Sequence, residues 1–147
     1  MRSIFEEIIL NLSKLLDIDM HVDELGNCTL LVDDKIEVTL EYDDTSEKLL
    51  IFTPLNEIPP GKFRENVLIF SLKENNDLNF LFTLGYIESE NMLAMSYTQD
   101  IDKLNNEELM DILNNFNITA TFLYDSISQG TIPMIDDTST NKPFNLK

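Results

Sequence analysis

The side chains with the greatest chemical reactivity are Cys28 and His21, the single cysteine and the single histidine of the chain. A cysteine nucleophile needs a base beside it, and only this pair could provide one. Their spacing implies no such geometry, and Cys28 stands next to the apolar run Leu30-Leu31. Free cysteine in that setting is usually a small buried hydrophobe. Without a second histidine, relay chemistry and typical zinc coordination also lack ligands, so we predict no catalytic residue and no metal site.

Acidic residues alternate over Asp17, Asp19, His21 and Asp23 in a way that suggests a calcium-binding loop. Such a loop needs glycine at its sharp turn and a bidentate glutamate at its last position. Val22 occupies the first of these positions and Cys28 the second, so the match fails.

Two acidic doublets, Asp33-Asp34 and Asp43-Asp44, could in principle be paired catalytic carboxylates. Both lie between strand-like segments, where solvated aspartate is ordinary turn chemistry. The glycines are isolated from one another, so no phosphate-binding loop exists: Gly26, Gly61, Gly85, Gly130. The sequence therefore favours a protein that is not an enzyme and holds no cofactor.

Three short strands are predicted near residues 27–32, 36–42 and 48–53. In the middle one, apolar residues from Ile36 to Tyr42 alternate with polar ones, as in a strand with one buried face. A three-residue loop of Asp33 to Lys35 would put Cys28, Leu30 and Val32 on the core face, whereas a two-residue loop would put Thr29 and Leu31 there. We favour the longer loop.

Helices are predicted on either side of these strands and at the end of the domain. Ser3 and Glu6 form a capping box before a wide apolar stripe: Ile4, Phe5, Ile8, Ile9, Leu12, Leu15, Leu16. A second helix follows Pro59-Pro60-Gly61, from about residue 63 to 75. Asn105 and Glu108 begin a third, with a predicted buried side of Leu109, Ile112, Leu113, Phe116, Ala120, Leu123, Ile127.

A second hairpin is predicted between the last two helices, from about residues 78–88 and 92–98. The order α-β-β-β-α-β-β-α predicts an α+β fold with a twisted antiparallel sheet packed against helices. We expect one domain over residues 1–129, with Gly130 ending the last helix, and a flexible tail over residues 130–147.

Two strands carry apolar residues on both faces, which is more than one core requires. Leu49 and Ile51 alternate with Leu50 and Phe52 in the third strand, and the fourth shows the same feature. A helix, a second subunit or a ligand would each cover the second face. This pattern is typical of a binding scaffold.

The net charge of −17 belongs almost entirely to the predicted domain. A surface of this sign repels nucleic acid and anionic lipid and attracts basic partners. The N-terminal stretch contains Glu6 and Glu7 where a signal peptide would be uninterruptedly apolar, and no segment has the roughly 20 apolar residues of a membrane span. With one cysteine and no possible internal disulfide, the expected location is the cytoplasm.

Several segments together resemble one family, the Tir-chaperone-like (CesT) family of class I type III secretion chaperones. They are the strand Asn27-Cys28-Thr29-Leu30-Leu31-Val32-Asp33, the segment Glu37-Val38-Thr39-Leu40 with its acidic turn, Leu49-Leu50-Ile51-Phe52-Thr53-Pro54-Leu55, Pro59-Pro60, and Leu84-Gly85-Tyr86. The resemblance covers roughly residues 4–128 and rests on pattern, size and acidity more than on any single motif.

The resemblance implies a bacterial, cytoplasmic homodimer, with the second helix and fourth strand at the two-fold interface. The interface candidates are Val67, Leu68, Phe70, Leu72, Phe80, Phe82, Leu84. It also implies that the N-terminal segment of a secreted effector wraps around the dimer in extended form. The effector-binding candidates are Phe5, Ile9, Leu12, Leu16, Leu31, Leu50, Phe52.

The expected function is therefore a virulence-associated chaperone that keeps effectors soluble and competent for secretion, with the export ATPase as a further partner. An alternative is a regulatory adaptor of the same fold that sequesters a basic protein. A small-molecule-binding domain or enzyme is a third reading, for which the sequence offers no convergent polar set.

Overall fold

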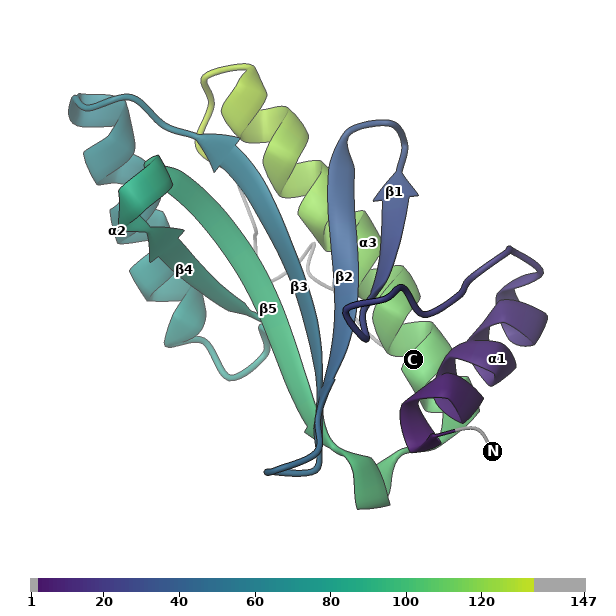
Figure 1. Cartoon of the computed structure of the whole chain (residues 1–147). Helices are drawn as coiled ribbons and strands as arrows, with labels where there is room; N and C mark the ends of the chain where they lie inside the picture. Colours follow the sequence, from purple (N-terminus) through teal and green to yellow (C-terminus); the bar gives the residue numbers. More distant parts are fainter. Residues whose placement is uncertain (1–2, 134–147) are drawn as a thin grey trace.

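The computed structural model describes residues 3–133, which form one five-stranded antiparallel sheet and three α-helices (Figure 1). The elements are α1 (Ile4–Leu16), β1 (Cys28–Val32), β2 (Ile36–Asp43), β3 (Lys48–Glu57), α2 (Lys62–Asn75), β4 (Thr83–Ile87), β5 (Met92–Asp100) and α3 (Asn106–Ser128). The strand order is β1-β2-β3-β5-β4. The predicted α+β class and element order are confirmed, while most of the predicted tail lies outside the described residues.

Helices α1 and α3 begin where their capping residues predict. The Glu6 N–H donates to Ser3 Oγ at 3.1 Å, and the Ser3 N–H donates to Glu6 Oε1 at 2.9 Å, which completes the capping box. Asn105 Oδ1 accepts from the N–H groups of Glu107 and Glu108. Each cap satisfies backbone donors that have no partner within a first helical turn.

The β1–β2 hairpin has the register of the longer predicted loop. Val32 pairs with Ile36, and Cys28 with Leu40, so these residues share the core face. Asp33 and Asp34 both have positive φ angles, 54° and 56°. Aspartate tolerates this conformation better than most residues because its short side chain can bond locally, which is why an acidic doublet can make the turn.

Strand β3 is longer than predicted, because Pro54 does not end it. Its pairing with β2 stops at Phe52, while its pairing with β5 continues through Pro54 opposite Ala94 to an irregularity before Glu57. The Thr53 hydroxyl donates to the carbonyl of Glu37 at 2.8 Å, on the side where the ladder has ended. Proline lacks an N–H, so it is tolerated where a strand has lost one partner.

Strand β4 is shorter than predicted, because residues 78–82 form a turn and a loop before it. Asp77 Oδ1 accepts from the Asn79 N–H, and the Asp77 carbonyl accepts from the Phe80 N–H. This side-chain turn competes with the sheet ladder. The alternation of Phe80 and Phe82 therefore does not mark a strand.

The core lies between α3 and one face of the sheet (Figure 1). Helix α2 lies beside β4, and α1 lies near the N-terminal end of α3. Phe116 of α3 is fully buried, and its ring centroid lies 5.3 Å from that of Phe82 in an edge-to-face contact. The predicted buried side of α3 is confirmed except for Ile112, which is half-buried.

Candidate protein-binding surfaces

The sheet face that points away from α3 is open in the described protomer. A row of paired residues crosses all five strands on this face: Thr29, Thr39, Phe52, Ser96, Thr83. None of these five is buried, whereas the residues that alternate with them on β3, Ile51 and Thr53, are fully buried. Phe52 is thus a large ring among small hydroxyl side chains.

Three of the predicted effector-binding residues lie together on this open face. Leu31 on β1 is 62% exposed, and Leu50 and Phe52 on β3 are half-buried. The strand between them carries acidic residues: Glu37 pairs with Leu31, and Glu41 pairs with Leu50. The surface therefore combines apolar contact area with negative charge, which suits a segment carrying both apolar and basic side chains.

The two edges of the sheet differ. Strand β1 has no further strand beside it among residues 3–133, and it carries the exposed Leu31. At the opposite edge, the Asn75 side chain exchanges two hydrogen bonds with the backbone of Leu84 in β4. An unpaired edge can accept an extended peptide as an additional strand, so β1 offers more backbone groups for this purpose than β4 does.

Helix α1 contributes less surface than the sequence predicts. Phe5, Ile9 and Leu12 are buried inside the protomer, at 4%, 2% and 0% exposure, so in this conformation they are core residues. Leu16, the remaining candidate, is half-buried. The exposed apolar residues of α1 are Ile4 at 58% and Leu15 at 43%, and neither is among the predicted effector-binding residues.

The predicted dimer-interface residues also divide into buried residues and residues that are at least partly exposed. Val67, Phe70, Phe82 and Leu84 are at most 9% exposed, because they pack within the protomer. Leu68 and Phe80 are half-buried, and Leu72 is 70% exposed.

Three further exposed residues extend the apolar surface of α2 and of the loop that follows it. They are Ile69, Leu78 and Leu81, at 49%, 98% and 44% exposure. Together with Leu72 they give this part of the chain four exposed large apolar side chains. The sequence around Leu78 did not predict this loop, because the segment was interpreted as the start of a strand.

The two residues considered for catalysis, Cys28 and His21, lie in different surroundings. Cys28 is 1% exposed, and its burial raises the pKa of the thiol. His21 and Asp19 are both highly exposed. Within residues 3–133 no group of three or more histidine, cysteine or acidic side chains could hold a metal ion.

The acidic residues of the turns hold those turns together. Asp23 Oδ1 accepts from the N–H groups of Leu25 and Asn27. Asp43 accepts from the Ser46 hydroxyl and the Thr45 N–H, and these bonds lower its pKa. The described part of the chain also contains no helix with the length and apolar character of a membrane span.

A family model described as "Tir chaperone protein (CesT) family" matches residues 7–123, which is most of the chain. The chain belongs to the Tir chaperone protein (CesT) family. The predicted resemblance is therefore confirmed, and the match runs from within α1 through every strand and α2 to most of α3. A search of curated protein sequences finds no significant match.

Solved structures similar to this CesT-family chain include complexes of secretion chaperones. The crystal structure of the ExsC-ExsE complex matches with a TM-score of 0.65 and 20% identity, covering 82% of this chain and 90% of that one. The Yersinia pestis type III secretion chaperone SycH, in complex with a fragment of YscM2, matches with a TM-score of 0.62 and 12% identity, covering 80% and 97%. The ExoT-SpcS complex from Pseudomonas aeruginosa matches with a TM-score of 0.60 and 20% identity, covering 82% and 97%. At these identities the likeness concerns the fold.

Proposed function

We propose that this chain is a cytoplasmic, dimeric chaperone that binds the N-terminal segment of type III secretion effectors in extended form and keeps them soluble until export. Its CesT-family membership supports the class of function. The observation that carries the mode of binding is the open sheet face, where the exposed Leu31 lies on the unpaired edge strand β1.

An extended client fits this face for three physical reasons. Its backbone N–H and C=O groups can pair with the edge of β1, its apolar side chains can contact Leu31 and Phe52, and its basic side chains can approach Glu37 and Glu41. The effector-binding residues retained in this proposal are Leu16, Leu31, Leu50 and Phe52, joined by Ile4 and Leu15. The net charge of −17 keeps the complex soluble and accelerates encounter with a basic segment.

The homodimer is proposed to form through α2 and the loop before β4. Leu68, Leu72 and Phe80 are retained from the expected interface, and Ile69, Leu78 and Leu81 are added because they are exposed. Pairing two such surfaces would remove these exposed apolar side chains from water. The export ATPase stays a prediction from the family resemblance, and none of these surfaces is assigned to it.

Co-expression with a candidate secreted effector tests the proposal. The wild-type chain should co-purify with that protein through the client's N-terminal segment. Leu31→Asp should lose the client while keeping its oligomeric mass, because the side chain is exposed and its replacement leaves the core intact. Leu25→Asp is the matched control, since Leu25 is 86% exposed in the loop before β1.

Retention of the client by Leu31→Asp to the wild-type level would contradict binding at this face. Binding that needs a folded client domain and that disappears with added salt would instead favour the regulatory adaptor. Failure to hold any secreted protein would contradict the chaperone function itself.

A further inference from the structure

The tip of the β1–β2 hairpin separates from the rest of the sheet (Figure 1). The pairing of β2 with β3 ends at Thr39 opposite Phe52, so within the described chain Ile36–Val38 pair with β1 and not with β3. Beyond that point the Thr53 hydroxyl of β3 donates to the Glu37 carbonyl at 2.8 Å. The position of the tip therefore depends on its contacts with α3 more than on the sheet ladder.

The two strands of the hairpin tip are buried to different extents. Ile36 and Val38 of β2 are 2% and 0% exposed. Their partners on β1, Val32 and Leu30, are only half-buried, although they point to the same face. The core thus fixes β2 more firmly than β1, and the outer strand is free to tilt about the inner one.

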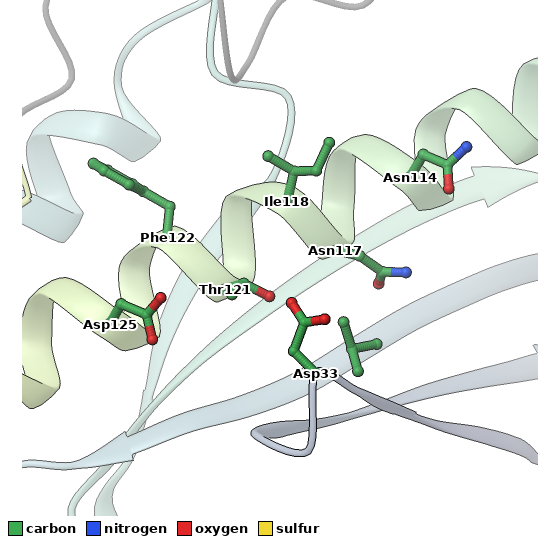
Figure 2. A pocket seen from close by; sticks show the side chains of 8 residues that line it. Asp33, Asn114, Asn117, Ile118, Thr121, Phe122 and Asp125 are labelled. Carbon is green, nitrogen blue, oxygen red and sulfur yellow. The ribbon is translucent and has the colours of Figure 1, made fainter.

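A groove of about 640 Å³ lies between this end of β1 and α3 (Figure 2). Val32 and Asp33 line one side, and a stripe of α3 lines the other: Asn114, Asn117, Ile118, Thr121, Phe122, Asp125. Asn117 Oδ1 and Thr121 Oγ1 have no hydrogen-bond partner among residues 3–133, so neither atom ties the hairpin to the helix. The groove leaves room for the end of β1 to move.

Lys35, the last residue of the hairpin loop, joins the tip to α3. Its Nζ donates to Asp125 Oδ1 at 2.8 Å. This bond raises the pKa of Lys35, and the nearby Asp33 carboxylate acts in the same direction. Both side chains of the pair are 40% exposed, so its contribution to the global free energy of unfolding is small. A local equilibrium of a weakly held strand is more sensitive to such a pair.

The loop transmits the position of Lys35 to β1. The Lys35 N–H donates to the Val32 carbonyl at 3.0 Å, across the two residues Asp33 and Asp34. Both of these have positive φ angles, 54° and 56°, which close the turn tightly. A displacement of Lys35 away from α3 therefore carries the end of β1 with it.

We propose that the Lys35–Asp125 ion pair positions the edge strand β1 for the client by holding the hairpin tip against α3. The inference rests on the proposed function, because β1 is the edge on which the client would pair. A strand that is already held in place avoids the ordering free energy that a mobile strand would add to binding. Lys35 and Asp125 act through β1 and are positioning residues.

Hydrogen exchange in the client-free protein tests whether the pair holds β1. Lys35→Glu and Asp125→Lys should each speed backbone amide exchange in residues 28–38 by about two- to fivefold, the range expected for an exposed ion pair. The double variant Lys35→Glu/Asp125→Lys restores opposite charges and should exchange at the wild-type rate. Exchange in β5 should stay unchanged in all three, which shows that the fold is intact.

Client affinity tests whether this position matters for binding. The probe is the N-terminal fragment of an effector that co-purifies with the wild-type chain. Both single variants should bind it about two- to fivefold more weakly, and the double variant should bind it as the wild type does. The two single variants shift the net charge in opposite directions, so a general effect of charge on a basic client would give them opposite changes in affinity. Lys62→Glu, at an exposed position of α2, is the control and should leave exchange in residues 28–38 unchanged.

The outcomes separate this inference from the proposed function. Wild-type exchange rates over residues 28–38 in both single variants would overturn the inference, as would faster exchange with unchanged or tighter client binding. A double variant that stays as weak as the single ones would also overturn it, because the two charges would then not act as a pair. A wild-type chain that binds no effector fragment would contradict the proposed function, and the exchange rates would still decide whether the pair holds β1.

Discussion

The side-chain amide of Asn75 at the end of α2 bonds both backbone groups of Leu84 in β4. Asn75 Oδ1 accepts from the Leu84 N–H at 2.8 Å, and Asn75 Nδ2 donates to the Leu84 carbonyl at 2.8 Å. The amide thus takes the place of a neighbouring strand at this point. The contact joins α2 to the sheet and occupies part of an edge that could otherwise pair with another chain.

Asn75→Ala should destabilise the protein and leave the β4 edge open. Two hydrogen bonds are lost, each worth about 1 kcal/mol net, so the free energy of unfolding should fall by about 1–2 kcal/mol. Urea denaturation measures the loss, and sedimentation should show more association beyond the native oligomer. Asn79→Ala, in the loop before β4, is the control and should change neither value.

Asn75→Asp separates the two bonds. The carboxylate still accepts from the Leu84 N–H but cannot donate to the Leu84 carbonyl, so a loss similar to or greater than that of Asn75→Ala is expected at neutral pH. Wild-type stability in Asn75→Ala would show that the contact contributes nothing to the fold.

The ion pair of Lys48 and Asp100 should give a stability that depends on pH. The two residues are direct cross-strand partners of β3 and β5, and Lys48 Nζ lies 2.7 Å from Asp100 Oδ1. The hydrogen bond to Lys48 lowers the pKa of Asp100, and the same bond raises the pKa of Lys48. Lys48→Met should therefore melt at a lower temperature than the wild type at pH 7.

The difference should shrink on acidification. Asp100 has a lowered pKa in the folded state, so its contribution is present above its ordinary pKa of 3.8 and is lost as the pH falls through the folded value. Melting curves from pH 7 to pH 2 measure this, and added salt should reduce the effect at pH 7 because both side chains are partly exposed. A difference that stays constant down to pH 2 would contradict an electrostatic origin.

Cys28 should react with thiol reagents only when the fold opens. The side chain is 1% exposed and its pKa is raised by burial, so both access and thiolate population are low in the native protein. Ellman's reagent should modify the native protein slowly and the urea-unfolded protein at once. A Thr29→Cys control, on the exposed face of the same strand, should react quickly without denaturant. Rapid native-state modification of Cys28 would contradict its core position.

The elements of this fold could be predicted where local chemistry and periodicity agree. The capping box at Ser3 and the alternation from Ile36 to Tyr42 are local, and the longer loop between β1 and β2 follows from which register puts apolar residues on one face. These signals involve residues close in sequence. They were therefore sufficient to predict the helix starts and the hairpin register.

The parts that could not be predicted depend on contacts between distant residues. Pro54 remains inside β3 because β2 has stopped pairing there, which the sequence near Pro54 does not show. The apolar stripe of α1 does not reveal that Phe5 and Leu12 are buried while Ile4 and Leu15 are exposed, because that depends on where α3 lies. In the same way, Phe82 was predicted to contact a second subunit, whereas it packs on Phe116 of its own chain.

Leu72→Asp should convert the proposed dimer to a monomer without unfolding the protein. Leu72 is 70% exposed in the described protomer, so the folded monomer tolerates the substitution. In an apolar dimer interface the same charge would be buried without a partner, which costs several kcal/mol. Light scattering should give the protomer mass of 17.0 kDa for Leu72→Asp and twice that for the wild type.

Two further substitutions separate this interface from the core. Leu25→Asp replaces an equally large, exposed leucine outside α2 and should remain dimeric. Phe82→Asp places a carboxylate against the rings of Phe116 and Tyr97, so it should lose helical signal in circular dichroism and not give a folded monomer. If Leu72→Asp and Leu68→Asp both keep the dimer mass, the two-fold contact does not use α2, and the exposed leucines of that helix must serve another partner.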